Sequence, residues 1–408
     1  MKTKDSIFSA PNGKSYLIPF ILVTSLFLLW GFAHGLLDVL NKHFQGTFNM
    51  TKAESGLVQF STYIAYFVMA LPAGLFMKKF GYKWGIILGL FLFALGAFAF
   101  IPAAFVDSAV PFLIALFVIA CGLCFLETAA NPYSTVLGPQ ESSAQRLNLS
   151  QSFNGLGWVL GPLVGGALIF GADEKDKFAP TLPYILVGSI VVVVAILFLI
   201  VKLPNIQEKS EEEVKKETET TSVESRSIWS HRHFVLAVIA QFLYCAAQTG
   251  IFAFFINYVM ELDSNLTKQT ASQMLSLGGM ASLMIGRLSG SFIMKWAAPN
   301  KLLALYALVN TVCMTLVMMS LGQLSLISLY CSFFFMSIMF PTIFALGLRG
   351  MGTLTKKASS FIVMGVAGGA FSPILMGYIG EANMAIGFVV PLISFIYILF
   401  YALKGYKL

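Results

Sequence analysis

The chain has 408 residues, of which 57% are hydrophobic and only 11% are charged, and its formal net charge is +7. A soluble globular protein carries about 25% charged residues, so this composition excludes a soluble fold. Its high apolar content also excludes a disordered chain. Five cysteines are too few for a disulfide scaffold of this length. The composition is that of a protein that crosses a membrane several times.

Apolar runs between polar breaks predict twelve membrane-spanning helices, because a helix crosses the hydrocarbon core with roughly 20 apolar residues. The runs are continuous rather than alternating, which argues against an outer-membrane barrel. The first run is too long for a cleavable signal peptide. The predicted spans are 17–40, 54–77, 85–106, 111–137, 145–170, 183–203, 232–260, 270–294, 301–321, 324–348, 357–380 and 384–403.

The distribution of lysine and arginine predicts that both termini are cytoplasmic, because cytoplasmic loops carry the excess of these residues. With this orientation 21 of the 26 Lys and Arg lie inside, including Arg287, which we assign to the loop between spans eight and nine. The net charge of +7 is then explained by topology, and no nucleic-acid partner is expected. The five on the outside are Lys42, Lys52, Lys175, Lys177 and Lys268.

A polar, glutamate-rich segment divides the spans into six and six. We therefore predict an N-terminal six-helix half at 1–203, a cytoplasmic linker at 204–231 and a C-terminal six-helix half at 232–408. Charge runs of this kind usually remain solvated, so we interpret the segment as a solvated linker, with a regulatory site as the alternative.

Matching positions in the two halves indicate an internal duplication. Pro132 and Pro341 end spans four and ten at an offset of 209, and Gly157 and Gly368 lie in spans five and eleven at an offset of 211. Two parallel six-helix halves with a substrate site between them are typical of the major facilitator architecture. The expected fold class is thus an all-α membrane protein with twelve transmembrane helices in two pseudo-symmetric halves. The glycines within the spans predict close helix packing.

Two acids lie inside predicted spans, Asp38 in span one and Glu127 in span four. An acid at the helix centre costs roughly 2.5–3.5 kcal/mol on insertion scales. Neither acid has a Lys or Arg in its own span, so a structural ion pair is a poor explanation for either. Because desolvation disfavours a charged carboxyl, each can load and release a proton near neutral pH. The alternative is a neutral acid with a structural hydrogen bond.

Polar side chains at helical spacing surround the two acids and predict a cavity lined by paired donors and acceptors. Such a lining suits the hydroxyls of a neutral sugar, and no Lys or Arg cluster within the spans would bind an anion. His34 shares a helix face with Asp38, and it either couples to that acid or lines water. Phe252 and Phe340 are candidate apolar platforms for a sugar ring. The predicted substrate-binding residues are Asp38, Asn41, Glu127, Asn131, Gln151, Asn154, Gln241, Tyr244 and Gln248.

Other signals for chemistry are weak. His34 and His43 lack the spacing of a metal site, and we expect no metal. The chain has no phosphate-binding Gly-Lys-Ser/Thr loop, which leaves direct coupling to ATP unsupported.

Four sequence elements resemble those of the bacterial fucose permease family, which contains L-fucose:proton symporters and glucose/galactose and N-acetylglucosamine relatives. They are LETAANP at 126–132, QSFN at 151–154, MS followed by PTIF between 336 and 344, and SSFIVM at 359–364. The resemblance covers nearly the whole chain except the linker, and it implies a bacterial inner-membrane sugar transporter.

This resemblance also implies roles for individual residues. Asp38 matches an acid used in sugar recognition and coupling, and Glu127 matches the acid that binds sugar and takes the proton. Gln151, Asn154 and Gln248 match polar residues of the sugar cavity. The chain departs from the L-fucose permeases at Met339-Phe340, where they have a more polar Gln-Tyr pair.

We therefore predict a proton-coupled symporter that imports a neutral monosaccharide of the fucose, galactose, glucose or N-acetylglucosamine class by alternating access. It is expected to be a monomer among membrane lipids, not an enzyme, and to use no cofactor besides the coupling ion. Three alternatives remain open: coupling to sodium, passive facilitation, and an intramembrane enzyme that uses Asp38 and Glu127 as acid and base.

Overall fold

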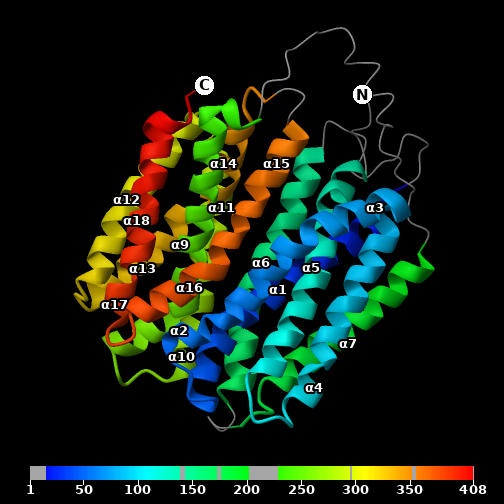
Figure 1. The fold of residues 1–408 in the computed structure, drawn as a ribbon, viewed down its shortest axis with the longest axis horizontal. Helices are drawn as coiled ribbons and strands as arrows, with labels where there is room; N and C mark the ends of the chain where they lie inside the picture. The colour runs from blue at the N-terminus through cyan, green and yellow to red at the C-terminus, as the bar shows by residue number, and fades with distance from the viewer. Residues whose placement is uncertain are drawn as a thin grey trace, which may run out of the picture.

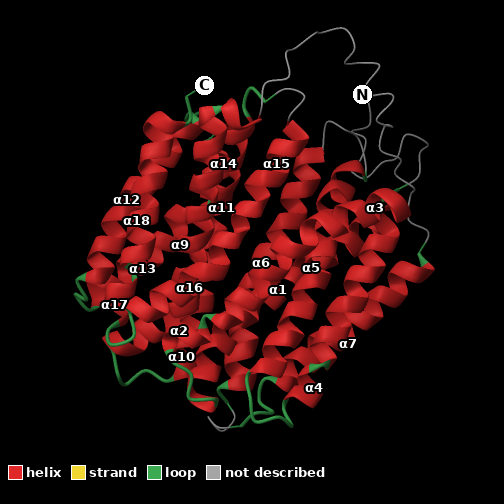
Figure 2. Ribbon diagram, viewed as in Figure 1, coloured by secondary structure: helices red, strands yellow, loops and turns green. Residues whose placement is uncertain are grey.

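The computed structural model describes residues 15–137, 143–171, 176–201, 228–294, 296–351 and 355–407. In this part of the chain the regular elements that cross the molecule are all helices, joined by short loops (Figure 2). Helices are the expected solution for an apolar chain in lipid, because a helix satisfies its own backbone hydrogen bonds. Most of the predicted linker, residues 204–227, lies outside the described residues.

Helices before the linker form one side of the molecule in Figure 1, coloured blue to green. They are α1 (Leu17–Thr47), α2 (Lys52–Ser55), α3 (Leu57–Phe98), α4 (Phe100–Ala103), α5 (Val110–Val136), α6 (Ser143–Ile169) and α7 (Thr181–Ile200). Within this side α1 packs on α6, and α3 packs on both α5 and α7.

Helices after the linker form the other side (Figure 1). They are η2 (Ile228–Ser230), α9 (Arg232–Leu262), α10 (Lys268–Gln273), η3 (Met274–Met280), α11 (Ala281–Ile293), α12 (Pro299–Met318), α13 (Gln323–Met336), α14 (Met339–Leu348), α15 (Thr355–Met364), η5 (Gly365–Ala367), α16 (Gly368–Ile379), α17 (Met384–Gly387), α18 (Val389–Phe400) and η6 (Tyr401–Gly405). Here α9 packs on α14, α16 and α18.

Eleven helical segments in the described residues are long and apolar enough to cross a membrane, and they coincide with eleven of the twelve predicted spans. The remaining prediction, span eight, corresponds to α10, η3 and α11, which follow one another from Lys268 to Ile293 without a break. The middle of this run, Met274–Met280, is a π-helix. Such wide turns occur mostly as local insertions at functional sites. The chain is therefore the multi-pass helical membrane protein that the sequence predicts.

Spans two and three are continuous in α3 and separate at Gly81. Its φ of 82° and ψ of 166° are a conformation that only glycine adopts readily. The glycine thus turns the chain between two antiparallel spans without a longer loop.

The predicted duplication is visible in how the glycines pack. A Cβ atom on Gly157 of α6 would overlap the backbone carbonyl of Leu28 on α1, and one on Gly368 of α16 would overlap the carbonyl of Phe242 on α9. Gly157 and Gly368 are the pair matched at an offset of 211. The fifth helix of each half therefore approaches the first helix of the same half through an equivalent glycine, which confirms the expectation of close packing.

Candidate functional site

Asp38 lies in the second half of α1 and is almost completely buried, with 3% of its surface exposed. The Gln59 side chain of α3 donates a hydrogen bond from Nε2 to Asp38 Oδ1, at 3.4 Å. The second oxygen, Oδ2, has no hydrogen-bond partner among the described residues. A buried carboxyl with one long hydrogen bond and no ion pair is a poor structural element. The geometry thus leaves Oδ2 available to carry a proton.

Glu127 lies on α5 and is connected to α1 through a tyrosine of α3. The Tyr66 hydroxyl forms a hydrogen bond with Glu127 and also lies 3.1 Å from His34 Nε2. His34 is one turn before Asp38 on α1, so His34 and Tyr66 connect the surroundings of the two acids. The structure connects the surroundings of the two acids through His34, which the sequence pattern indicated, and through Tyr66, which it did not.

A cavity of about 440 Å³ lies between α3 and α5 on one side and α14, α15 and η5 on the other. This volume is within the range of small-molecule sites, about 300–1,000 Å³. Its polar groups come from α3 and α5, whereas the helices after the linker contribute apolar side chains. The lining residues are Tyr66, Phe67, Ala70, Leu71, Cys124, Glu127, Thr128, Asn131, Phe344, Val363, Met364, Val366 and Ala367.

Aromatic rings cluster around His34 next to the acids. The Trp158 ring of α6 stacks on His34 with centroids 5.3 Å apart, and Tyr63 of α3 lies at 6.0 Å. Trp158 also makes an edge-to-face contact, at 5.6 Å, with Phe252 of α9. This contact joins a helix that precedes the linker in the sequence to a helix that follows it. Phe252 itself stacks on Phe333 and is 2% exposed.

The predicted amide side chains before the linker form hydrogen bonds with one another and with the backbone. Gln151 donates to Asn131 Oδ1 at 3.1 Å, and Asn154 donates to the carbonyl of Phe27 at 3.2 Å. Asn41 is fully buried and is hydrogen-bonded at both ends of its amide. Asn131 lies on the cavity wall, whereas the amide of Asn41 is engaged within the protein.

The predicted residues after the linker form a second group. Gln241 and Tyr244 of α9 are completely buried, and Gln248 is half-buried. The Phe340 ring of α14 lies edge-on to Tyr244 with centroids 6.1 Å apart. These side chains lie on the helices that face α1 and α3, but the cavity of 440 Å³ is lined by Phe344 rather than by Phe340.

Arg287 corrects one detail of the predicted topology. It is not in the loop after span eight but inside α11, which continues to Ile293. It lines a smaller cavity of about 140 Å³ between α6 and α11, together with Gln151, Ser152 and Trp158. The predicted bounds of span eight, 270–294, already contain Arg287, and only the count of cytoplasmic charges assigned it to the loop.

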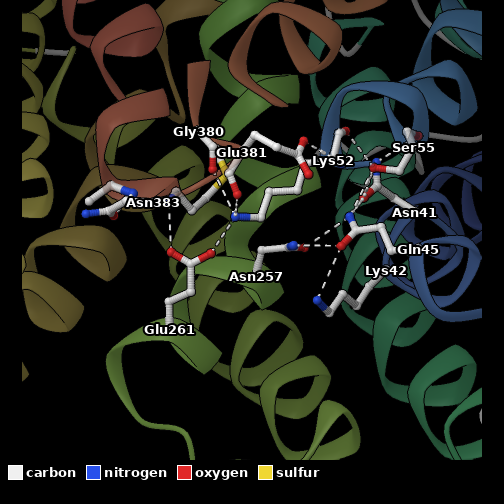
Figure 3. A network of polar contacts seen from close by, with 12 residues as sticks. Asn41, Lys42, Gln45, Lys52, Ser55, Asn257, Glu261, Gly380, Glu381 and Asn383 are labelled. Carbon is white, nitrogen blue, oxygen red and sulfur yellow. Dashed lines mark hydrogen bonds and ion pairs between the residues drawn. The ribbon is translucent and has the colours of Figure 1, made fainter. Parts of the chain in front are cut away.

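One end of the molecule, formed by α2, α10 and α17, is closed by polar contacts between the two sides (Figures 1 and 3). We call it the outer end, because the charge distribution predicts that it faces outside. Lys52 Nζ donates to Glu261 Oε1 at 2.6 Å and to the carbonyls of Gly380 and Glu381, each at 2.9 Å. Thr51 and Glu54 form a capping box that fixes the start of α2. We call the contacts of Lys52 the outer latch.

A second contact at the outer end lies deeper. Asn257 of α9 donates from Nδ2 to Gln45 Oε1 of α1 at 2.7 Å. On the same interface, Ser272 and Ser276 donate to the carbonyls of Pro162 and Val159 on α6. The outer end is thus closed across the interface, and the larger cavity lies beyond these contacts.

An acid on the wall of a cavity between two helical bundles, with a second acid buried on a neighbouring helix, is a feature of a membrane transporter rather than of a soluble binding protein. Residues 20–373 match the Major Facilitator Superfamily. The chain belongs to this superfamily, and its members are transporters, not enzymes.

Known sequences narrow the relationship. The chain is 39% identical to an L-fucose-proton symporter of Escherichia coli, over 96% of this chain and 94% of that protein. It is 36% identical to a glucose/galactose transporter of Brucella abortus, over 97% of this chain and 95% of that protein. These similarities confirm the resemblance to the fucose permease family.

Solved structures of sugar transporters have the same fold as this chain. The fold matches the E. coli fucose:proton symporter in an outward conformation with a TM-score of 0.69 at 36% identity, covering 97% of this chain and 100% of that one. It also matches a D-xylose-proton symporter with a TM-score of 0.78, covering 96% and 98%. At 14% identity the latter shows the common fold alone.

Proposed function

We propose that this protein is a proton-coupled symporter that imports a neutral monosaccharide through the interface between its two halves. The observation that supports it best is Glu127, an acid without a cationic partner in its own span, on the wall of a sugar-sized cavity. The relatives named as an L-fucose-proton symporter and a glucose/galactose transporter support the same class of substrate. We place the protein in the bacterial cytoplasmic membrane, as a monomer with both termini in the cytoplasm.

The proposed cycle uses the closed outer end and the two acids. With the outer end open, Asp38 and Glu127 take protons and the cavity takes the sugar. Neutral acids are buried at less cost than charged ones, so closure of the outer end is favoured with protons bound. The sugar and the protons then leave on the side of the termini, and the empty protein returns.

The energy available is enough for accumulation. Moving one charge across 100 mV is worth about 2.3 kcal/mol. At about 1.4 kcal/mol for each factor of ten, one proton supports a sugar gradient of about 50-fold.

The lining supports a sugar rather than an ion as the main substrate. Glu127, Thr128 and Asn131 offer acceptors and donors on one wall, and Phe344, Val363 and Met364 give the opposite wall an apolar surface. A sugar presents hydroxyls at its edge and an apolar ring face, which these two walls match. The apolar wall and Met339-Phe340 favour a sugar that is held mainly from the α3 and α5 side.

The variant Glu127→Gln tests the coupling role, because it keeps the size and hydrogen-bonding capacity of the side chain but cannot release a proton. We expect it to lose accumulation of sugar against a gradient while it retains measurable exchange of labelled for unlabelled sugar. Loss of both activities in a correctly folded variant would contradict a coupling role. Dependence of native uptake on sodium, with no response to a proton gradient, would make sodium the coupling ion.

A further inference from the structure

A chain of amides connects Asp38 to the contact between Gln45 and Asn257 at the outer end, and Figure 3 shows its outer part, formed by Asn41, Gln45 and Asn257. Gln59 Nε2 donates to Asp38 Oδ1, and Asn41 Nδ2 donates to Gln59 Oε1 at 3.0 Å. Gln45 Nε2 donates to Asn41 Oδ1 at 3.0 Å, and Asn257 Nδ2 donates to Gln45 Oε1 at 2.7 Å. We call Gln59, Asn41, Gln45 and Asn257 the amide relay, with Asn257 as its outer member.

In the contacts along the relay, Gln59, Asn41 and Gln45 each direct the NH₂ group towards Asp38 and the oxygen towards the outer end. Gln45 Nε2 also donates to Ser55 Oγ at 3.0 Å and to Asn257 Oδ1 at 3.4 Å. Hydrogen bonds in such a chain polarise one another, and those to an ionised acceptor are the strongest. The relay therefore stabilises a negative charge on Asp38 when it is complete, and less when its outer member is missing.

Burial makes this arrangement effective. Asn41 is 0% exposed, Gln59 1% and Asn257 2%, whereas Gln45 is half-buried, so water has little access to replace a lost member while the outer end is closed. Asn257 lies after the linker and the other members lie before it. The relay is thus complete only when the two sides meet at the outer end.

We infer that Gln59, Asn41 and Gln45 are positioning residues through which the closed outer end eases release of the proton from Asp38, because they offset part of the preference of the buried acid for its neutral form. This inference rests on the proposed function. A symporter must bind its proton while the outer end is open and release it after that end has closed, although closure buries the acid. Asn257 completes the relay on closure and offsets part of the cost of leaving a buried charge on Asp38.

Other titratable and charged groups surround the path, and the substitutions of Asn257 and Gln59 described below leave all of them in place. Lys42 and Lys52 lie at its outer end, where Lys42 donates to Gln45 Oε1 at 3.3 Å. The groups near Asp38 on the packed helices are His34 on α1, Tyr63 and Tyr66 on α3, Glu127 on α5, and Cys245 on α9.

The test is the pH dependence of sugar uptake by the full-length protein in proteoliposomes. Asn257→Ala removes the outer member of the relay without touching Asp38. We expect the pH of half-maximal uptake to rise, by about 0.5 unit, a threefold change in proton affinity. Gln59→Leu removes the last donor, and we expect a rise of about one unit, or tenfold. In the Gln59→Leu background, Asn257→Ala should have no further effect.

Lys52→Met is the matched control, because it also weakens the outer end but does not belong to the relay. An equal shift in Lys52→Met would overturn the inference, since any loosening of the outer end would then suffice. An unchanged pH midpoint in Asn257→Ala would also overturn the inference. So would a midpoint shift by Asn257→Ala that is equally large in the native protein and in the Gln59→Leu background. Sugar exchange by each variant checks that it is folded. If native uptake itself does not depend on pH, the proposed function fails rather than the relay.

Discussion

The outer latch makes a quantitative prediction, because Lys52 is the main cation that joins the two sides at the outer end in the described structure. Its ammonium group donates to one carboxylate and two carbonyls, and 14% of its side chain is exposed. Replacement by methionine keeps the length and the apolar part of the side chain but removes all three hydrogen bonds. We expect Lys52→Met to shift the protein towards states with an open outer end.

The size of the shift follows from these contacts. An ion pair with a partner that is 36% exposed contributes at most about 1 kcal/mol. The two carbonyl hydrogen bonds to a charged group add about 1 kcal/mol after discount for the solvent that replaces them. A total of about 2 kcal/mol changes the ratio of open to closed outer ends about 30-fold.

Spin labels on the exposed residues Val110 and Ser264 measure this ratio, since they lie at the outer end on opposite sides of the linker. The native cysteines are buried or half-buried, which favours labelling of introduced ones. The control is Lys177→Met, whose ion pair with Asp107, at 2.6 Å, joins two residues of the same side. Unchanged distances in Lys52→Met, or an equal change in Lys177→Met, would refute the reasoning.

Three further substitutions test the packing and the site. Gly161→Ala places a Cβ atom 2.6 Å from the α1 backbone, so we expect it to lower the free energy of unfolding by about 1–3 kcal/mol in thermal unfolding. Gly74→Ala is the control, because no atom lies within 4 Å of its Cβ position, and it should cost much less. Trp158→Ala removes the ring stacked on His34, and we expect sugar binding to weaken about tenfold; unchanged binding would exclude the ring from the site. Tyr66→Phe removes a hydrogen-bond donor to the acid of α5, so uptake should persist to higher pH, and a midpoint that moves to lower pH would contradict that contact.

The sequence was sufficient for the spans and for the two acids because both signals are local. A run of about 20 apolar residues specifies a helix in lipid, and an acid within that run is conspicuous. The equivalent glycines Gly157 and Gly368 were also detectable, since an internal repeat preserves spacing along the chain. Span eight was found in spite of its π-helix, because hydropathy does not depend on the helix type.

The contacts between helices could not be predicted in the same way. Gln59, Tyr66 and Trp158 look like ordinary residues of apolar spans, and their roles appear only when α1, α3 and α6 pack together. A weak signal was present in span two, where Gln59, Tyr63 and Tyr66 share a face at spacings of four and three. Asn41 illustrates the limit of such patterns, because sequence spacing indicated a sugar ligand and the structure shows an amide fully engaged within the protein.

The most direct test of proton-coupled sugar transport is the pH change that a sugar gradient alone produces in proteoliposomes with no other energy source. The assay needs a panel of L-fucose, D-glucose, D-galactose, D-mannose and N-acetylglucosamine, with Glu127→Gln and Asp38→Asn in parallel. The account predicts that one or more of these sugars makes the external medium alkaline on entry, and that Glu127→Gln abolishes the response. Sugar entry without any pH change, in the native protein, would contradict it.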